Sequence, residues 1–545
     1  MKVSLKYGFL VASALILSVS CTDLEETVYT DIKASDYVPG EDDLFSNIGK
    51  SYTTLRAWLF GWHGNFDLQE ECSDEILTPV RPNGWNDGGV YKEMHWHNWT
   101  SEHGHVASNY GNLNSGISSC NFGIYKIESG TIPIASEEEK QSVIAELKVL
   151  RAFYYYILCD EFGNVPIVTR FDLPSDYLPE QSTRQQVFDF VINSIKDNIN
   201  YLSEDTDAKY YGRINKWTAY TILAKMYLNA EVYIGKPMYS ECIAACDAII
   251  GSGNYSLEAV YKDIFKVENE GSSEIIFAIP FKTSDDGKYG WFHLVWKTLH
   301  PANQSTIKAT YTPWGGICGI PQFINTYAAN DKRLKDTWIM GQQYDANGNI
   351  LYCTLDPKYA TTPLSYDNYI PSVKLTTEYN GYRIGKFEFE PDMGWGGQSN
   401  DWPMFRYADV LMMKAESMLR TGDAGGAAQI VTQVRKRNFE NSADAEVTGN
   451  QLMQGSCYKY GFFERGKFKD GAEEDGDDIQ YGRFLDELGW EFAAEAHRRQ
   501  DLIRFGVFTR KSWMSHTPNG DYRSIFPIPY TVLNTNTNLE QNPGY

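Results

Sequence analysis

Two segments of this chain share a plan of paired helices, which constrains the fold more than any other feature of the sequence. Residues 216–250 and 407–437 each contain a helix with closely spaced small residues, a short glycine-containing turn and a second helix. Ala224 and Ala230 supply the small residues of the first segment, and Ala415 those of the second. Such a pair buries its apolar face only by stacking on neighbouring pairs. The sequence therefore predicts a mostly α-helical scaffold of stacked helix pairs.

Two further helices with clear start signals extend this scaffold. Ser136 and Thr183 each precede a stretch of helical apolar periodicity and are followed three residues later by Glu or Gln. This is the capping-box pattern of a helix N-terminus. We expect the helical scaffold mainly in residues 136–251 and 406–510, with the tetratricopeptide-like plan of an α-α superhelix.

Residues 484–508 form the most regular stretch, with apolar side chains at intervals of three and four. Glu491 and Glu495 stand one turn apart, Glu495 has arginines three and four residues on, and Gly506 is a stop signal. One interpretation is a helix held by ion pairs. The other makes Glu491 and Glu495 a general acid and base, which needs a cleft that one helix does not form. We favour the structural interpretation.

The remaining parts of the chain, about residues 61–125 and 252–405, are irregular and rich in Gly, Pro and aromatic residues. Residues 274–281 have the pattern of a strand, and Asn347-Gly348 is a hairpin signal. A long insertion without regular structure is unusual in a compact domain, so we expect ordered loops that carry the function.

These loops contain the residue types that a sugar site needs. Sugar rings offer weakly apolar C–H faces and hydroxyl edges, which suit flat aromatic side chains flanked by Asp, Asn, Gln or Arg. Roughly half of the Trp residues are expected in the core instead. The predicted ligand-binding residues are Asp74, Arg81, Asn83, Trp85, Asp87, Trp96, Trp296, Tyr311, Trp314 and Trp395. Polar, Gly-rich neighbours make Trp85, Trp314 and Trp395 the best candidates for exposure.

The charge of the chain limits its partners. A formal net charge of −22 argues against nucleic acid and favours a neutral over an anionic glycan. The sequence has no G-x-S-x-G elbow, P-loop or H-E-x-x-H motif. We therefore predict no catalytic residue and no cofactor, although 71 acidic residues leave a glycoside hydrolase open.

Two stretches raise the question of a metal ion, and we predict none at either. His95 and His97 would face the same side of a strand, a spacing that can bind a metal, but hydrogen-bonded loop histidines are the simpler interpretation. The acidic tract 469–478 has the composition of a solvated loop and lacks the ligand alternation of an EF-hand, so calcium is only a minor option.

The N-terminus has the pattern of an export signal. Lys2 and Lys6 precede an apolar run over residues 9–19, and Cys21 follows directly after LSVS. Residues 1–20 are expected to be a signal peptide. The segment resembles a bacterial lipobox, in which Cys21 would take lipid; the alternative is an ordinary signal peptide with an incidental Cys. The sequence contains no C-x-x-C pair and leaves the disulfide state of the other eight cysteines open.

Four segments together resemble the SusD/RagB family of outer-membrane nutrient-binding lipoproteins. The family's C-terminal signature runs roughly L-D-E-R-G-x-E-x-x-x-E-G-x-R-x-x-D-L-x-R, and Asp486, Gly489, Glu491, Glu495 and Arg498 are among the residues that match it. The chain departs from it with Leu for Arg, Ala for Gly and Gln for an aromatic residue. The other segments are the lipobox, the run RAFYYY and the run RYADVLMMKAESML.

The resemblance implies a single SusD-like domain over residues 21–545, anchored by Cys21 to the outer membrane and facing the cell exterior. It implies a non-catalytic protein that binds an oligosaccharide and delivers it to a SusC-like TonB-dependent transporter, over which it acts as a lid. Binding residues vary within the family, so the resemblance supports the region and not the individual residues. A peptide ligand and a tetratricopeptide adaptor that binds a protein remain as alternatives.

Overall fold

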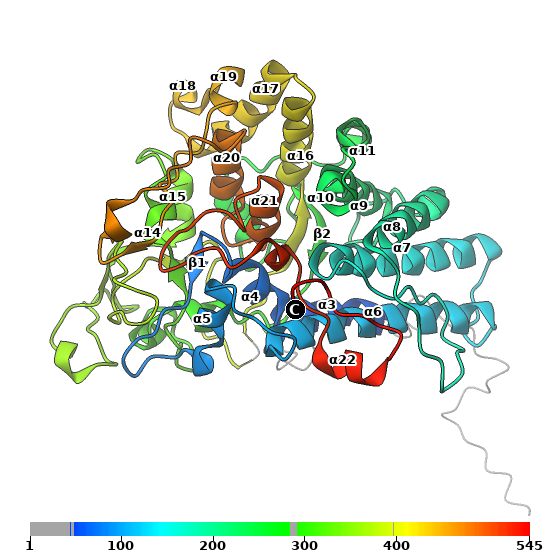
Figure 1. Ribbon diagram of the computed structural model, residues 1–545, viewed down its shortest axis with the longest axis horizontal. Coiled ribbons are helices and arrows are strands. Elements are labelled where there is room, and N and C mark those ends of the chain that lie inside the picture. Colours follow the sequence, from blue (N-terminus) through cyan, green and yellow to red (C-terminus); the bar gives the residue numbers. More distant parts are fainter. Residues whose placement is uncertain (1–43, 45–47, 284–290, 396) are drawn as a thin grey trace, which may run out of the picture.

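The computed structural model describes residues 44, 48–283, 291–395 and 397–545. Most of the regular structure is helical, and the longest strands have five residues. The helices stack at the top and right of Figure 1, whereas irregular segments fill the left. The mostly helical fold is as predicted. Two scaffold helices, α3 (Lys50–Phe60) and α6 (Gly104–Glu128), lie outside the predicted scaffold segments, and most of α6 lies within the portion that was expected to be irregular.

The scaffold is a continuous succession of helices, in which each helix packs against the one that follows it. The succession consists of α3 (Lys50–Phe60), α6 (Gly104–Glu128), α7 (Glu137–Glu161), α8 (Arg184–Asn198), α9 (Lys216–Leu228), α11 (Tyr239–Ser252), α16 (Tyr407–Arg420) and α17 (Ala424–Arg435). The two predicted helix pairs, α9 with α11 and α16 with α17, meet where α11 packs on α16. Segments that are far apart in the chain thus form one helical stack.

Both predicted helix starts are capped in the structure by the side chains expected from the sequence. The Ser136 side chain accepts the Glu139 backbone N–H at the start of α7. Thr183 and Gln186 form a reciprocal capping box at the start of α8, so two backbone donors that a helix leaves unpaired are satisfied.

Shorter helices connect and flank the scaffold. They are α4 (Asn65–Glu70), α5 (Val90–His95), α10 (Ala230–Ile234), α12 (Leu294–Thr298), α13 (Gln304–Ile307), α14 (Pro321–Ile324), α15 (Lys332–Thr337), α18 (Ser442–Ala445), α19 (Gly449–Leu452), α20 (Gly482–Phe492), α21 (Arg498–Arg504) and α22 (Tyr530–Thr535).

The strands in the described part of the chain pair as two-stranded antiparallel ribbons. The pairs are β1 (Ile76–Leu77) with β3 (Cys318–Gly319), β2 (Ile275–Ile279) with β8 (Trp402–Arg406), β4 (Trp338–Ile339) with β7 (Arg383–Ile384), β5 (Gly341–Gln342) with β6 (Ser365–Tyr366), and β9 (Phe463–Glu464) with β10 (Lys467–Phe468). β2 confirms the strand predicted at residues 274–281. Asn347-Gly348 also forms the expected turn, with Tyr344 bridging to Ile350.

The single helix expected over residues 484–508 is broken, and that prediction was wrong. α20 ends at Phe492, and the backbone of Ala494 and Ala496 has positive φ angles of 61° and 62° before α21 begins. This conformation is rare for residues with a Cβ atom. The break turns Glu495 away from Arg498 and toward other segments.

Those segments supply the cations that hold the break in place. The Arg406 guanidinium binds Glu495 at 2.7 Å, Glu491 at 2.9 Å and Glu274 at 2.8 Å, and Lys386 contacts Glu495 at 2.5 Å. These side chains are buried. Three cations, from Arg437, Arg406 and Arg333, hold the pKa of Glu491 at about 2 against the opposing effect of burial. Glu491 and Glu495 are thus held by buried ion pairs, but their partners come from distant segments, and Arg498 and Arg499 pair with Asp74 and Asp160 instead.

Candidate functional site

Six aromatic rings from five separate segments form a continuous row in the irregular half. Neighbouring ring centroids lie 4.5–6.5 Å apart, and their planes meet at 39–64°. We call this set the aromatic row. In order, it contains Trp85, Trp314, Trp62, Trp291, Trp395 and Tyr311.

Three of the six rings in the aromatic row are open to solvent. Trp62, Tyr311 and Trp395 expose 47%, 48% and 43% of their surface. Trp85 and Trp314 are half-buried behind them. Monomeric proteins rarely expose several large aromatic side chains together unless the patch contacts a ligand or partner. An indole also offers an apolar face with one polar N–H, which suits the C–H faces and hydroxyl groups of a sugar.

Backbone hydrogen bonds to α12 fix the segment that carries Trp314. The Trp314 N–H donates to the carbonyl of Trp296 at 2.6 Å, and the N–H groups of Gly316 and Ile317 donate to the carbonyl of Lys297 at 2.7 and 2.9 Å. A Cβ atom on Gly316 would lie 2.8 Å from the Trp85 ring, so glycine is needed there for Trp85 to pack. The Trp85–Trp314 contact therefore depends on a rigid loop.

A buried ion pair lies behind the aromatic row. The Lys297 ammonium contacts both oxygens of Asp67 at 2.5 Å, and His105 Nε2 lies 3.1 Å from the same carboxylate. Burial alone would raise the pKa of Asp67, but Lys297 and His105 outweigh it and hold that pKa well below its usual range. Burial and the Lys297 charge lower the pKa of the adjacent His293 to about 3. This network stabilises the base of the site and is closed to a ligand.

Polar side chains border the aromatic row on two sides. His63 follows Trp62 directly and lies close enough to Asp87 for that carboxylate to affect its pKa, which burial and His105 lower overall. Next to Tyr311, the exposed Thr312 hydroxyl donates to Gln304 Oε1 at 2.8 Å. These groups are placed to hydrogen-bond the hydroxyl groups of a sugar that stacks on the rings.

The structure brings together four of the predicted residues, Trp85, Tyr311, Trp314 and Trp395, in the aromatic row. Asp87 lies two residues from Trp85 and is half-buried. Asn83 is exposed and donates to the carbonyl of Leu355 at 2.9 Å.

Three residues of the predicted site, Asp74, Arg81 and Trp296, are buried and contact other parts of the protein. The Asp74 carboxylate is held by Arg498 at 2.7 Å and by the Tyr460 hydroxyl at 2.8 Å. Arg81 is enclosed by backbone carbonyl groups, including that of Thr377, and burial lowers its pKa to about 9. Trp296 packs in a small apolar cluster under Trp314. All three support the loops from inside.

Trp96 lies outside the aromatic row. It is half-buried, its indole N–H donates to the carbonyl of Ser515 at 2.9 Å, and the ammonium groups of Lys92 and Lys374 lie 5.4 and 5.2 Å from its ring.

Sequence reasoning did not select Trp62 and Trp291. Trp62 stands in the run GWHG, so the criterion that selected Trp85, polar and glycine neighbours, also fits it. Trp291 is 9% exposed and joins the aromatic row through its contacts with Trp62 and Trp395. No local signal distinguishes it from a core tryptophan.

His95 and His97 are buried and lie within hydrogen-bonding distance of backbone carbonyl groups. His95 ends α5 and does not lie on a strand; its Nε2 lies 2.5 Å from the carbonyl of Met514, and His97 Nε2 lies 2.8 Å from that of Cys72. In the described part of the chain, no three His, Cys, Asp or Glu residues are grouped so that they could hold a metal ion. The eight cysteines in this part are free thiols.

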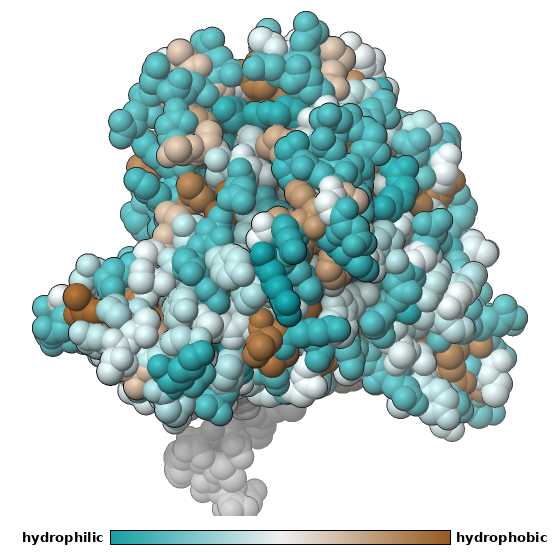
Figure 2. All heavy atoms as spheres, turned by 60° about the vertical axis from the view of Figure 1, so that its left-hand side comes forward, coloured by the Kyte–Doolittle hydropathy of each residue, from teal (hydrophilic) through white to brown (hydrophobic). Residues whose placement is uncertain are grey.

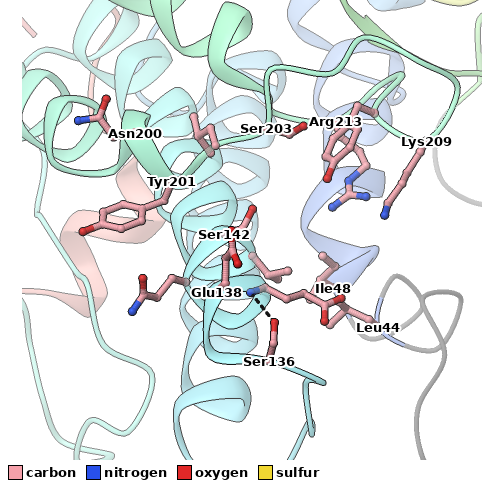
Figure 3. A pocket seen from close by; sticks show the side chains of 15 residues that line it. Leu44, Ile48, Ser136, Glu138, Ser142, Asn200, Tyr201, Ser203, Lys209 and Arg213 are labelled. Carbon is pink, nitrogen blue, oxygen red and sulfur yellow. Dashed lines mark hydrogen bonds between the residues drawn. The ribbon is translucent and has the colours of Figure 1, made fainter.

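A second hollow lies on the helical scaffold, between the start of α7 and the segment after α8 (Figure 3). It has a volume of about 610 Å³. Its described walls are mostly polar and contain two aromatic residues, Tyr201 and Tyr210. They lack the row of adjoining rings, so the aromatic row is the better candidate for a sugar site.

Comparisons with known proteins agree on one family. A profile of the SusD family matches residues 273–545, about half of the chain, and a profile described as starch-binding and associating with the outer membrane matches residues 66–228. The starch-binding protein SusD of Bacteroides thetaiotaomicron is 22% identical over 529 residues, which cover 88% of this chain and 85% of SusD.

Solved structures show the same fold. A laminarin-binding SusD-like protein superposes with a TM-score of 0.69 at 19% identity, covering 93% of this chain and 100% of that protein. Surface glycan-binding protein A from Bacteroides thetaiotaomicron, in complex with laminarihexaose, gives a TM-score of 0.68 at 20% identity, with coverages of 92% and 99%. The chain therefore belongs to the SusD family and has a single SusD-like fold.

Proposed function

We propose that the protein binds an oligosaccharide on the aromatic row without cleaving it. The row itself carries the proposal, because several exposed rings with polar groups beside them match the alternating faces and edges of a sugar chain. Membership of a family whose relatives bind starch and laminarin supports this class of ligand. Affinity for such an open site is expected in the micromolar to millimolar range, about −8 to −4 kcal/mol.

We further propose that the protein is a lipoprotein of the outer membrane that delivers its ligand to a SusC-like TonB-dependent transporter. Cys21, the expected lipidation site, and the signal peptide 1–20 lie outside the residues that the structure describes. Within the described residues, no helix is long and apolar enough to span a bilayer. The family profile that refers to the outer membrane supports this location.

The test is affinity gel electrophoresis of the purified protein against a panel of neutral and acidic polysaccharides, with a reducing-sugar assay on the same samples. We expect retardation by one glycan class without new reducing ends. New reducing ends would identify a glycoside hydrolase. If no glycan retards the protein, the aromatic row is not a stand-alone glycan site, and a peptide ligand becomes the better hypothesis.

A further inference from the structure

The β9–β10 hairpin forms one side of a hollow at the edge of the irregular half. The hollow has a volume of about 960 Å³ and is lined by residues 462–471. Phe463 and Phe468 are half-buried in it and contact each other, with ring centroids 5.1 Å apart. The hairpin lies at the left of Figure 1, on the side that is turned forward in Figure 2, where hydrophilic surface surrounds small apolar groups.

Three segments converge at Ser515 to make this region rigid. The Ser515 hydroxyl donates to Glu464 at 2.6 Å and accepts the Val373 N–H at 3.1 Å. The Ser515 N–H donates to the carbonyl of Phe463 at 3.1 Å, and its own carbonyl accepts the Trp96 indole N–H. The hairpin, the segment near Val373 and the residue that follows α5 are thereby fixed relative to one another.

Five cationic side chains surround this region, although the chain as a whole carries a net charge of −22. We call them the basic patch: Lys92, Lys374, Arg465, Lys467 and Lys469. None of the five forms an ion pair within the described part of the chain. The carboxylates nearby in sequence are those of Glu93, Glu464 and the acidic tract 469–478. Glu464 is already bound by the hydroxyls of Ser372 and Ser515, and in the acidic tract Glu473 and Asp475 pair with Lys459, and Asp478 with Lys511.

The basic patch places cations without an ion pair beside half-buried aromatic rings. This combination suits a ligand that has both a negative charge and an apolar face. Lysine and arginine bind carboxylate and sulfate through charge-assisted hydrogen bonds. The Trp96 and Phe463 rings supply the apolar surface. We propose that the basic patch is a second contact surface, which binds carboxylated or sulfated sugar units.

The basic patch and the aromatic row are neighbours, joined by α5. Tyr91 contacts the Trp85 ring at 5.0 Å, and the next residue, Lys92, stands over Trp96. Under this proposal, one long glycan chain contacts both surfaces. That the ligand is a sugar rests on the proposed glycan-binding function. That the basic patch binds a negatively charged group does not depend on it.

The test compares two double variants of the purified protein with equal changes in charge. Lys467→Glu with Lys469→Glu alters the basic patch, whereas Lys236→Glu with Lys332→Glu alters exposed lysines elsewhere. Affinity electrophoresis in gels containing polygalacturonate, dextran sulfate or a neutral glycan gives the readout. We expect the first variant to lose about tenfold or more in affinity for the polyanions and to keep its affinity for the neutral glycan. The second variant should behave as the wild type.

If the first variant loses affinity only for polygalacturonate, or only for dextran sulfate, the result would identify the acidic group that is recognised and support the proposal. If both variants lose affinity equally, the effect comes from net charge alone and the proposal is wrong. The proposal also fails if the wild type binds neither polyanion, or if polyglutamate competes as well as polygalacturonate, which would indicate an acidic protein ligand. Binding of the neutral glycan tests the aromatic row separately. Failure of the proposed glycan-binding function can therefore be distinguished from failure of the basic-patch proposal.

Discussion

Replacing Trp62 with alanine is the sharpest test of the aromatic row, because this ring lies in its middle and is 47% exposed. A tryptophan side chain has about 250 Å² of surface, so about 120 Å² is open to a ligand. At about 25 cal/mol per Å², full coverage by an apolar group would contribute about 3 kcal/mol. A sugar face is partly polar, so we expect a loss of about 1–2 kcal/mol, or a factor of about 5–30 in Kd.

Isothermal titration calorimetry with the glycan identified by the binding screen measures this change. The matched control is Tyr201→Ala, which removes a ring of 52% exposure from the hollow shown in Figure 3. We expect its affinity to equal that of the wild type. An affinity of Trp62→Ala within twofold of the wild type, or an equal loss in Tyr201→Ala, would refute the assignment of the site. Both rings are exposed, so unfolding midpoints in urea should not change and will show that any loss concerns binding.

Three further predictions concern stability. Trp296→Ala removes a buried ring and should lower the free energy of unfolding by about 3–5 kcal/mol in urea denaturation; a loss below about 1 kcal/mol would contradict its placement in the core. Arg406→Met leaves three buried carboxylates with one cation fewer and should cost about 3–5 kcal/mol, whereas an unchanged urea midpoint would show that the cluster tolerates the loss. Burial raises the pKa of Glu161 to about 8 and lowers that of His97 to about 3. Protonated Glu161 therefore contributes to the free energy of unfolding below its unfolded pKa, and this contribution is lost as pH rises toward 8. Neutral His97 contributes above its unfolded pKa, and its contribution is lost as pH falls toward 3. The urea midpoint should therefore fall at both low and high pH. In Glu161→Gln the midpoint should fall less as pH rises toward 8, and an unchanged dependence on pH would contradict the raised pKa of Glu161.

The buried charges explain why the C-terminal signature was only partly predictable. Periodicity correctly identifies the helices on either side of Phe492, because apolar spacing is a local property. The same spacing pairs Glu495 with the arginines that follow it. In the folded chain Arg406, about ninety residues earlier, binds Glu495 instead and accompanies the break between α20 and α21. The spacing of nearby residues does not predict an ion pair between residues so far apart in the sequence.

The sequence by itself determined the helical scaffold, the helix caps at Ser136 and Thr183, the irregular half and the family motif. Each of these depends on residues that are near one another in the chain, where period, cap and turn chemistry act. Only the tertiary structure decided which tryptophans are exposed. Trp291 and Trp296 are five residues apart in one segment, yet Trp291 lies in the aromatic row and Trp296 in a buried apolar cluster. The difference arises because loops from five segments converge there, and burial depends on what the rest of the chain places around a side chain.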